Sequence, residues 1–240
     1  MNLTGKMPTV MTTGTFARLP ALVLFLLAAF CLFMTALPGG VLAGSNEGKK
    51  IFDAGKCASC HQVKGPATEK TIQDVLAKKG PELWYSGSKF RPGFLEGWLK
   101  DPRPLRPMRY YSLTEKNPGD HPRLAPGDAA EVAAYLMSLK SAEARPSGIR
   151  PGVDPGGRAV FMKEQACYSC HQVTSRRGNA VGGLTGPSLV GAGSRLEPDW
   201  IYAYLSNPKV FKPVKDMPNY VGILDDSEMR ALASYISSFK

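Results

Sequence analysis

One heptapeptide occurs twice in this chain of 240 residues, as Cys-Ala-Ser-Cys-His-Gln-Val at 57–63 and as Cys-Tyr-Ser-Cys-His-Gln-Val at 167–173. Both copies contain Cys-x-x-Cys-His, the pattern typical of covalent c-type haem attachment. Two thiols separated by two residues can form thioethers with the two vinyl groups of one haem, and the adjacent histidine can bind its iron. The repeat therefore predicts two haem groups, and the candidate residues are Cys57, Cys60, His61, Cys167, Cys170 and His171.

Three other chemistries of paired cysteines account for less of the pattern. A redox dithiol and a structural disulfide would both leave the adjacent histidines without a role. A zinc ribbon would bring its two cysteine pairs within roughly 15–20 residues of each other, whereas Cys167 follows Cys60 by 107 positions. Haem attachment is therefore the interpretation that uses every residue of both motifs.

The first 43 residues have the composition of an export segment. They contain Lys6 and Arg18 and no acidic residue, and the stretch 19–37 is almost wholly apolar. Small residues ending at Ala43 follow, which is the order of a signal peptide and its cleavage site. The apolar stretch is also close to the roughly 20 residues that span a bilayer. We therefore expect 1–43 to be a signal peptide or an N-terminal membrane anchor.

Export and charge limit the partners of this chain. An exported chain would lie in the periplasm or at the outer face of the cytoplasmic membrane, and residues 19–37 could attach it there. The net charge of +10 suits contact with acidic proteins or anionic headgroups. The sequence contains no recognised nucleic-acid-binding motif, so nucleic acid is not an expected partner.

The chain also repeats itself outside the two motifs. A glycine and a phenylalanine four positions later precede each motif, as Gly48 and Phe52 and as Gly157 and Phe161. This spacing predicts an amphipathic helix on which the glycine allows another helix to approach closely. The sequence therefore predicts a helix of the same kind at the start of each half.

Downstream of the motifs the two halves align without a gap over 81–102 and 187–208. Each stretch begins at the proline of a Gly-Pro-x-Leu sequence. Pro92 and Pro198 suit the first turn of a short helix, which the proline that closes each stretch would end. Farther on, Asp-x-x-Glu sequences at 128–131 and 225–228 predict capping boxes for a closing helix.

These matches predict a domain organisation and a fold class. We expect haem domains at 45–140 and 157–240, joined by a linker rich in proline and glycine at 141–156. No alternating pattern of useful length indicates a strand. The expected fold class is therefore all-α, with two tandem helical haem domains after the apolar segment within 1–43.

The sixth iron ligand separates electron transfer from ligand chemistry. Met108 lies 47 residues after His61, and Met217 lies 46 residues after His171, each in a proline-flanked loop before the closing helix. Methionine opposite histidine suits an electron-transfer haem, whereas an open position would bind small ligands. We expect both methionines to ligate iron. His121 could replace Met108 and give bis-histidine iron, although its Gly-Asp-His-Pro context favours an exposed turn residue.

The chain resembles tandem class I cytochromes c, which are small, duplicated, exported helical haem domains. The resemblance covers nearly all of 45–240 and rests on the two haem motifs, the glycine-phenylalanine helix starts, the Gly-Pro-x-Leu loops, the two methionines and the aromatic closing helices. In that family the proline carbonyl of Gly-Pro-x-Leu binds the proximal histidine. The resemblance thus implies that Pro81 orients His61 and that Pro187 orients His171.

The expected function is electron transfer and not catalysis. A dihaem c-type cytochrome would pass electrons between respiratory redox proteins, either as a periplasmic carrier or as a haem subunit of a membrane complex. Two alternatives stay open, a peroxidase-like dihaem enzyme and a haem-based sensor, and each would leave one coordination position open.

Overall fold

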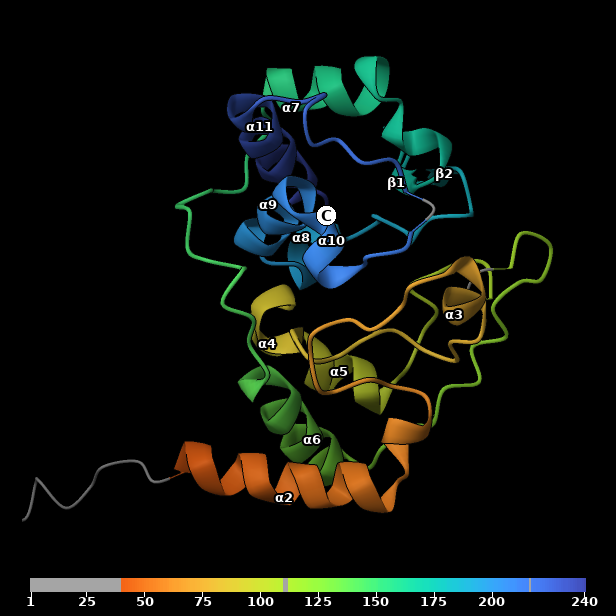
Figure 1. Cartoon of the computed structure of the whole chain (residues 1–240), viewed down its shortest axis with the longest axis vertical. Coiled ribbons are helices and arrows are strands. Elements are labelled where there is room, and N and C mark those ends of the chain that lie inside the picture. The colour runs from red at the N-terminus through yellow and green to blue at the C-terminus, as the bar shows by residue number, and fades with distance from the viewer. Residues whose placement is uncertain (1–39, 110–111, 216) are drawn as a thin grey trace, which may run out of the picture. The chain divides into compact units, whose positions relative to one another are not determined.

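The structure is a computed structural model that describes residues 40–109, 112–215 and 217–240 (Figure 1). Within it, Gly40–Lys240 forms one compact unit. The haem motifs of both halves therefore lie in a single body of protein.

The predicted apolar segment 19–37 lies outside the described residues. Ala43, after which cleavage was predicted, lies within helix α2 (Gly40–Ala54). Among the described residues, no helix is long and apolar enough to cross a membrane. Export or anchoring by residues 1–43 thus stays a prediction.

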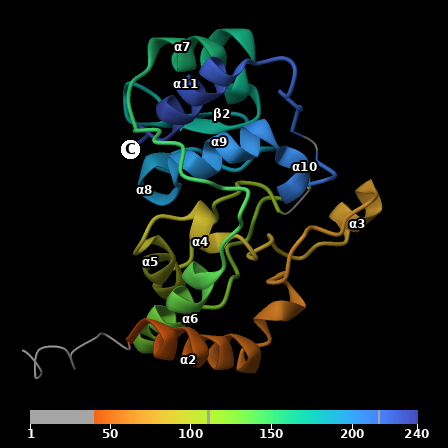
Figure 2. The same cartoon turned by 60° about the vertical axis from the view of Figure 1, so that its left-hand side comes forward.

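Each half is closed by a pair of helices from its two ends. In the first half, α2 packs against α6 (Pro126–Ser138), and the two lie side by side in both views (Figure 1 and Figure 2). In the second half, α7 (Pro155–Ala159) continues into the π-helical turn η2 (Val160–Glu164), and both pack against α11 (Asp226–Ile236). In both repeats, the helix at the start of the half therefore packs against the helix at its end.

Glycine permits the close contact in both helix pairs, as the sequence predicts. A Cβ atom on Gly48 would collide with the backbone carbonyl of Glu131, and one on Gly157 would collide with the carbonyl of Ala231. Any larger residue would therefore push the two helices apart.

The predicted phenylalanines fill equivalent places in the hydrophobic core that the two halves share. Phe52 and Phe161 are completely or almost completely buried. Phe52 meets Tyr135 edge-on with ring centroids 5.5 Å apart, and Phe161 meets Tyr235 edge-on at 5.8 Å. The periodic aromatic residues of the closing helices therefore belong to the core.

Shorter helices lie between the terminal pairs. In the first half these are α3 (Ile72–Leu76), α4 (Ser86–Lys89) and α5 (Phe94–Lys100), and in the second half they are α8 (Ala192–Arg195), α9 (Pro198–Ser206) and α10 (Pro208–Phe211).

The prolines predicted to lie in the first turn of these short helices do so in the second half only. Pro198 occupies the first position of α9, whereas Pro92 lies before the helix. There Gly93, with a φ of +82°, is the N-cap of α5, so the helix starts at Phe94, two residues after Pro92. After α9 ends, Pro208 also begins the separate short helix α10.

One of the two predicted capping boxes is wrong. The Asp225 side chain accepts a hydrogen bond from the Glu228 amide at 2.8 Å, and Glu228 accepts one from the Asp225 amide at the same distance. In the first half, however, α6 begins at Pro126, so Asp128 lies within the first turn. Proline at the first helical position fixes a helical φ, and here it moves the start toward the N-terminus.

The fold is helical, as expected, but it also contains one small sheet that was not predicted. Strands β1 (Gln172–Thr174) and β2 (Ala180–Gly182) pair antiparallel directly after the second haem motif, with Val173 opposite Val181. Gly178, at a φ of +82°, forms the turn between them. Three-residue strands are too short to produce a detectable alternating pattern.

The predicted linker is attached to the second half. Residues 141–154 form no helix or strand. Asp199 of α9 accepts a hydrogen bond from the Ser147 amide at 3.1 Å, and Arg230 of α11 donates to the Ser147 carbonyl at 3.2 Å. This stretch therefore packs along the helices of the second half, and the division at 141–156 stays a prediction.

The two halves meet through equivalent segments. The main chain of Phe90 forms an antiparallel bridge with that of Leu196. The Arg91 amide donates to the Arg195 carbonyl at 3.0 Å, and the Arg91 side chain donates to the Leu196 carbonyl at 3.1 Å. These bonds fix one repeat against the other directly after α4 and α8.

An aromatic cluster extends this contact. Tyr85 of the first half stacks on Trp200 of the second with ring centroids 6.1 Å apart, and it meets Phe211 edge-on at 5.1 Å. The ammonium group of Lys89 lies 4.8 Å from the centre of the Trp200 ring and 5.0 Å from that of Phe90. The interface between the halves thus combines packed aromatic rings with the Lys89 cation.

Candidate haem centres

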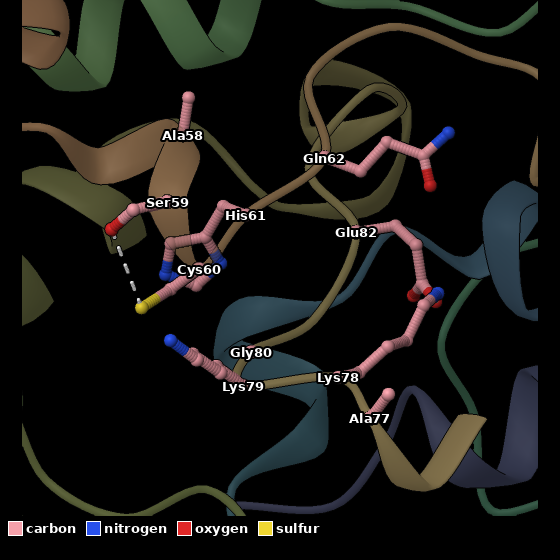
Figure 3. Close-up of a pocket in the computed structure, with 10 residues that line it drawn as sticks. All are labelled: Ala58, Ser59, Cys60, His61, Gln62, Ala77, Lys78, Lys79, Gly80 and Glu82. Carbon is pink, nitrogen blue, oxygen red and sulfur yellow. Dashed lines mark hydrogen bonds and ion pairs between the residues drawn. The ribbon is translucent and has the colours of Figure 1, made fainter. Parts of the chain in front are cut away.

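The first haem motif forms one tight turn. The 3₁₀ helix η1 (Cys57–Ser59) follows α2, and the His61 amide donates to the Cys57 carbonyl at 3.0 Å. Figure 3 shows the side chains of Cys60 and His61 next to each other on this turn. The local fold therefore gathers the elements of the motif in one place.

The second motif repeats this geometry. The 3₁₀ helix η3 (Cys167–Ser169) is followed by His171, whose amide donates to the Cys167 carbonyl at 3.1 Å. The residue before each motif has a left-handed backbone, with a φ of 52° at Lys56 and 45° at Ala166. Side chains other than glycine rarely adopt this conformation, and it is common at functional sites. No sequence signal revealed it, because neither residue is glycine or asparagine.

The thiols of both motifs are free, so neither pair forms the disulfide that was one alternative. Cys60 and Cys170 are exposed, and their partners are half-buried. Burial raises the pKa of the Cys57 thiol, and it raises that of Cys167 to about 11 despite a hydrogen bond with Tyr220. A redox dithiol typically has a lowered thiol pKa, so this environment does not favour that alternative.

The first candidate ligand is held by the Gly-Pro-x-Leu loop. The Nδ1 atom of His61 lies 2.8 Å from the carbonyl oxygen of Pro81. With Nδ1 donating to this oxygen, Nε2 keeps the lone pair that binds a metal. A Cβ atom on Gly80 would lie 2.7 Å from Cε1 of His61, so glycine is needed for the ring to approach. Burial lowers the pKa of His61, which favours the neutral ring that a metal requires.

The second candidate ligand has the same support. The Nδ1 atom of His171 lies 2.7 Å from the carbonyl oxygen of Pro187. A Cβ atom on Gly186 would lie 2.7 Å from Cε1 of His171. The hydrogen bonds that the resemblance implied are therefore present in both halves, although the sequence separation is 20 residues in the first and 16 in the second.

An ion-pair network supports the first loop and was not predicted. Glu82, directly after Pro81, is 3% exposed and binds Lys78 and Lys212, the latter at 2.8 Å. Figure 3 shows Lys78 reaching the Glu82 carboxylate at the edge of the pocket beside His61. Burial alone would raise the pKa of Glu82, but the two lysines hold it at about 2. No sequence pattern predicted this network, because Lys212 lies 130 residues away from Glu82.

The two predicted methionine ligands have different surroundings. Met217 is half-buried and packs against the main hydrophobic core. Met108 is only 6% exposed, and its main chain bridges to that of Lys116. Neither position establishes ligation, so both assignments stay predictions.

His121 is not the exposed turn residue that we expected. It is half-buried, and its ring centroid lies 6.0 Å from that of His61. Trp98 of α5 packs edge-on against it at 4.7 Å. The turn-like local sequence concealed this contact, which only the fold of the chain brings about.

Comparison with known protein families agrees with this geometry. The family model described as Cytochrome c matches the chain twice, over residues 45–140 and 156–240. The chain belongs to the cytochrome c family. It is thus a tandem duplication of a c-type haem domain, and the two domains imply two covalently bound haem c groups with iron. No curated protein and no solved structure matches the chain.

The residues of both sites suit this cofactor. Each cytochrome c domain offers two free thiols and a histidine whose Nδ1 meets a carbonyl oxygen. Among the described residues, no group of three or more histidine, cysteine, aspartate or glutamate side chains could hold a separate metal ion. The donors therefore fit a haem iron, which brings four nitrogen ligands of its own, better than a zinc ion held by protein alone.

Proposed function

We propose that this cytochrome c is an electron carrier with two haems and is not a catalyst. The observation that carries the proposal is the repeated site, in which free thiols stand beside a histidine fixed by a proline carbonyl. Each bound haem supplies an iron that gains or loses one electron. The attachment residues are Cys57, Cys60, Cys167 and Cys170, and the proximal ligands are His61 and His171.

The chain contributes orientation and a low-dielectric environment. The carbonyl oxygens of Pro81 and Pro187 accept hydrogen bonds from the Nδ1–H groups, which hold the imidazole rings and raise their basicity as ligands. Met217 is the proposed sixth ligand of the second haem, because it lies in the loop before α11 and packs against the core. A thioether ligand opposite histidine stabilises reduced iron, which suits an electron acceptor.

The interface between the halves supports relay through both haems. The main-chain bonds at Phe90 and Leu196 and the stacked rings of Tyr85 and Trp200 hold the domains together. A carrier built in this way can accept an electron at one domain and release it at the other. We propose respiratory redox proteins or membrane complexes as its partners. We also propose a location in the periplasm or at the outer membrane face, with attachment through residues 19–37.

Spectroscopy of the purified holoprotein tests the proposal. We expect two thioether-linked haems per chain by mass and haem content, reversible reduction of both, and no prompt binding of carbon monoxide. A double substitution, Cys167→Ala with Cys170→Ala, should lower the haem content to one. A haem that binds carbon monoxide at once would contradict the carrier and support the peroxidase-like enzyme or the haem-based sensor.

A further inference from the structure

One histidine lies outside the haem motifs, and the structure places it beside the first one. The chain contains three histidines, and His121 is the one that follows no Cys-x-x-Cys sequence. The ring centroids of His61 and His121 are 6.0 Å apart, with 50° between the ring planes. Two imidazoles on opposite sides of one metal ion, with about 2 Å from metal to nitrogen, have their centroids roughly 6 Å apart. The observed separation thus suits a shared metal.

A hydrogen bond from Nδ1 to a backbone carbonyl fixes the same tautomer in both rings. The Nδ1 atom of His121 lies 2.9 Å from the carbonyl oxygen of Pro122, just as Nδ1 of His61 lies 2.8 Å from that of Pro81. In each ring, donation from Nδ1 leaves Nε2 as the atom with a free lone pair. A carbonyl behind a ligating histidine is the usual arrangement in metal sites. His121 is therefore prepared to bind a metal in the same manner as His61.

The loop that carries His121 is braced against α5. Trp98 packs edge-on against the imidazole at 4.7 Å, and its own indole nitrogen donates to the Arg103 carbonyl at 2.8 Å. The Leu124 amide donates to the Leu99 carbonyl at 3.0 Å. These contacts hold the ring in place, which reduces the entropy that a ligand must lose on binding.

Met108 has the opposite surroundings. It lies in a turn that is closed by two hydrogen bonds, from the Arg109 amide to the Glu115 carbonyl at 2.8 Å and from the Asn117 amide to the Pro107 carbonyl at 2.9 Å. Protein atoms cover its side chain, which is 6% exposed. Met108 lies outside the hydrophobic core against which Met217 packs, so the packing that favours Met217 as a ligand does not extend to Met108.

We propose that His121, and not Met108, is the sixth ligand of the first haem. The inference rests on the proposed function and deepens it, since it makes the two haems unequal. Histidine on both sides of the first iron gives a lower reduction potential than histidine and Met217 at the second. Electrons then enter at the first domain and move to the second.

Ferric-state spectra of the holoprotein test this ligand set. The readouts are electron paramagnetic resonance and the near-infrared charge-transfer band of methionine-ligated iron, both normalised to haem. We expect one bis-histidine signal and one methionine signal. Met217→Leu should abolish the methionine band, and Met108→Leu should leave its intensity unchanged. His121→Ala should abolish the bis-histidine signal and open the first haem to carbon monoxide.

The outcomes separate this inference from the proposed function. If Met108→Leu halves the methionine band, or if His121→Ala leaves both signals unchanged, the inference is overturned. Met108→Leu nearly conserves side-chain volume, so it decides the question even where His121→Ala fails to fold. A haem content below two per chain in the unsubstituted protein would instead contradict the proposed function.

Discussion

The main chain of Phe90 pairs with that of Leu196, and these residues occupy the same position in the two repeats. The two bonds on either side are counterparts of each other, since the Arg91 amide donates to the Arg195 carbonyl at 3.0 Å and the Glu197 amide donates to the Lys89 carbonyl at 2.9 Å. Pairing of a segment with its own counterpart is the property of a two-fold symmetric dimer interface. Here both counterparts belong to one chain.

Gly80→Ala should disturb the first haem centre. The new Cβ would lie 2.7 Å from Cε1 of His61, and the ring could move away only by weakening its bond to Pro81. We expect a loss of about 1–3 kcal/mol in the free energy of unfolding of the holoprotein, the usual effect of overpacking. Denaturant titration measures it. Gly127→Ala in α6 is the matched control, because no neighbour lies within 4 Å of its Cβ position. An equal loss in both variants would contradict the steric explanation.

Glu82→Gln should destabilise the protein at neutral pH. The substitution leaves Lys212 beside an uncharged group in a buried place, whereas Lys78 keeps its ion pair with Glu69, and we expect a cost of about 3 kcal/mol. Glu96→Gln, which removes an exposed partner of Lys100, should cost less than about 0.5 kcal/mol. Urea unfolding of both variants gives the comparison, and similar values would show that burial does not strengthen the Glu82 pairs.

The effect of Glu82→Gln should depend on pH. The folded pKa of Glu82, about 2, is below its ordinary value of 4.5, so the carboxylate stabilises the fold above pH 4.5. This contribution is lost as the pH falls toward 2. The difference between the native protein and Glu82→Gln should therefore shrink over this range. A difference that stays constant from pH 7 to pH 3 would exclude the ionic origin.

The free energy of unfolding should rise in mild alkali, because Lys89 then loses its proton in the folded protein. Burial lowers its pKa to about 7 from 10.5, with Lys212 adding to the effect. The unfolded chain therefore binds the proton more tightly, and stability should rise by of order 1–3 kcal/mol between pH 7 and 10. Thermal unfolding of Lys89→Met should show less of this rise than unfolding of Lys140→Met, which removes an exposed lysine. Identical pH profiles would remove Lys89 as its source.

The helix caps give a direct test of where α6 and α11 begin. Asp225→Ala removes an N-cap that bonds the Glu228 amide, so it should cost about 1 kcal/mol, within the range of 0.5–2. Asp128→Ala removes a charge in the first turn of α6, and the expected loss is about 0.3–1 kcal/mol at low salt. Added salt should reduce the loss only for Asp128→Ala. The reverse order of losses would show that α6 is capped by Asp128.

Signals between near neighbours in sequence predicted much of this structure. The repeated glycine-phenylalanine spacing predicted that Gly48 and Gly157 lie at helix contacts. The Asp225 cap could be predicted because all the residues that form it lie within one helical turn. The same type of signal failed at Asp128, since Pro126 starts the helix earlier. The haem motifs were identifiable because their chemistry requires a fixed short spacing.

Contacts between distant residues could not be predicted. The environment of His121 depends on Trp98 and His61, which the loop sequence does not specify. Lys212 reaches Glu82 only because the two halves pack together. The β1–β2 pair rests on main-chain bonds between three-residue stretches, whose side chains carry no detectable period.

The stretch 141–154 makes the contact between the two halves independent of the protein concentration. By joining the halves, it turns the Phe90–Leu196 pairing from a meeting of two molecules into a contact within one. A contact made within one chain does not depend on the concentration of the protein. The separation between the two haems is therefore a property of the single molecule, and dilution does not alter it.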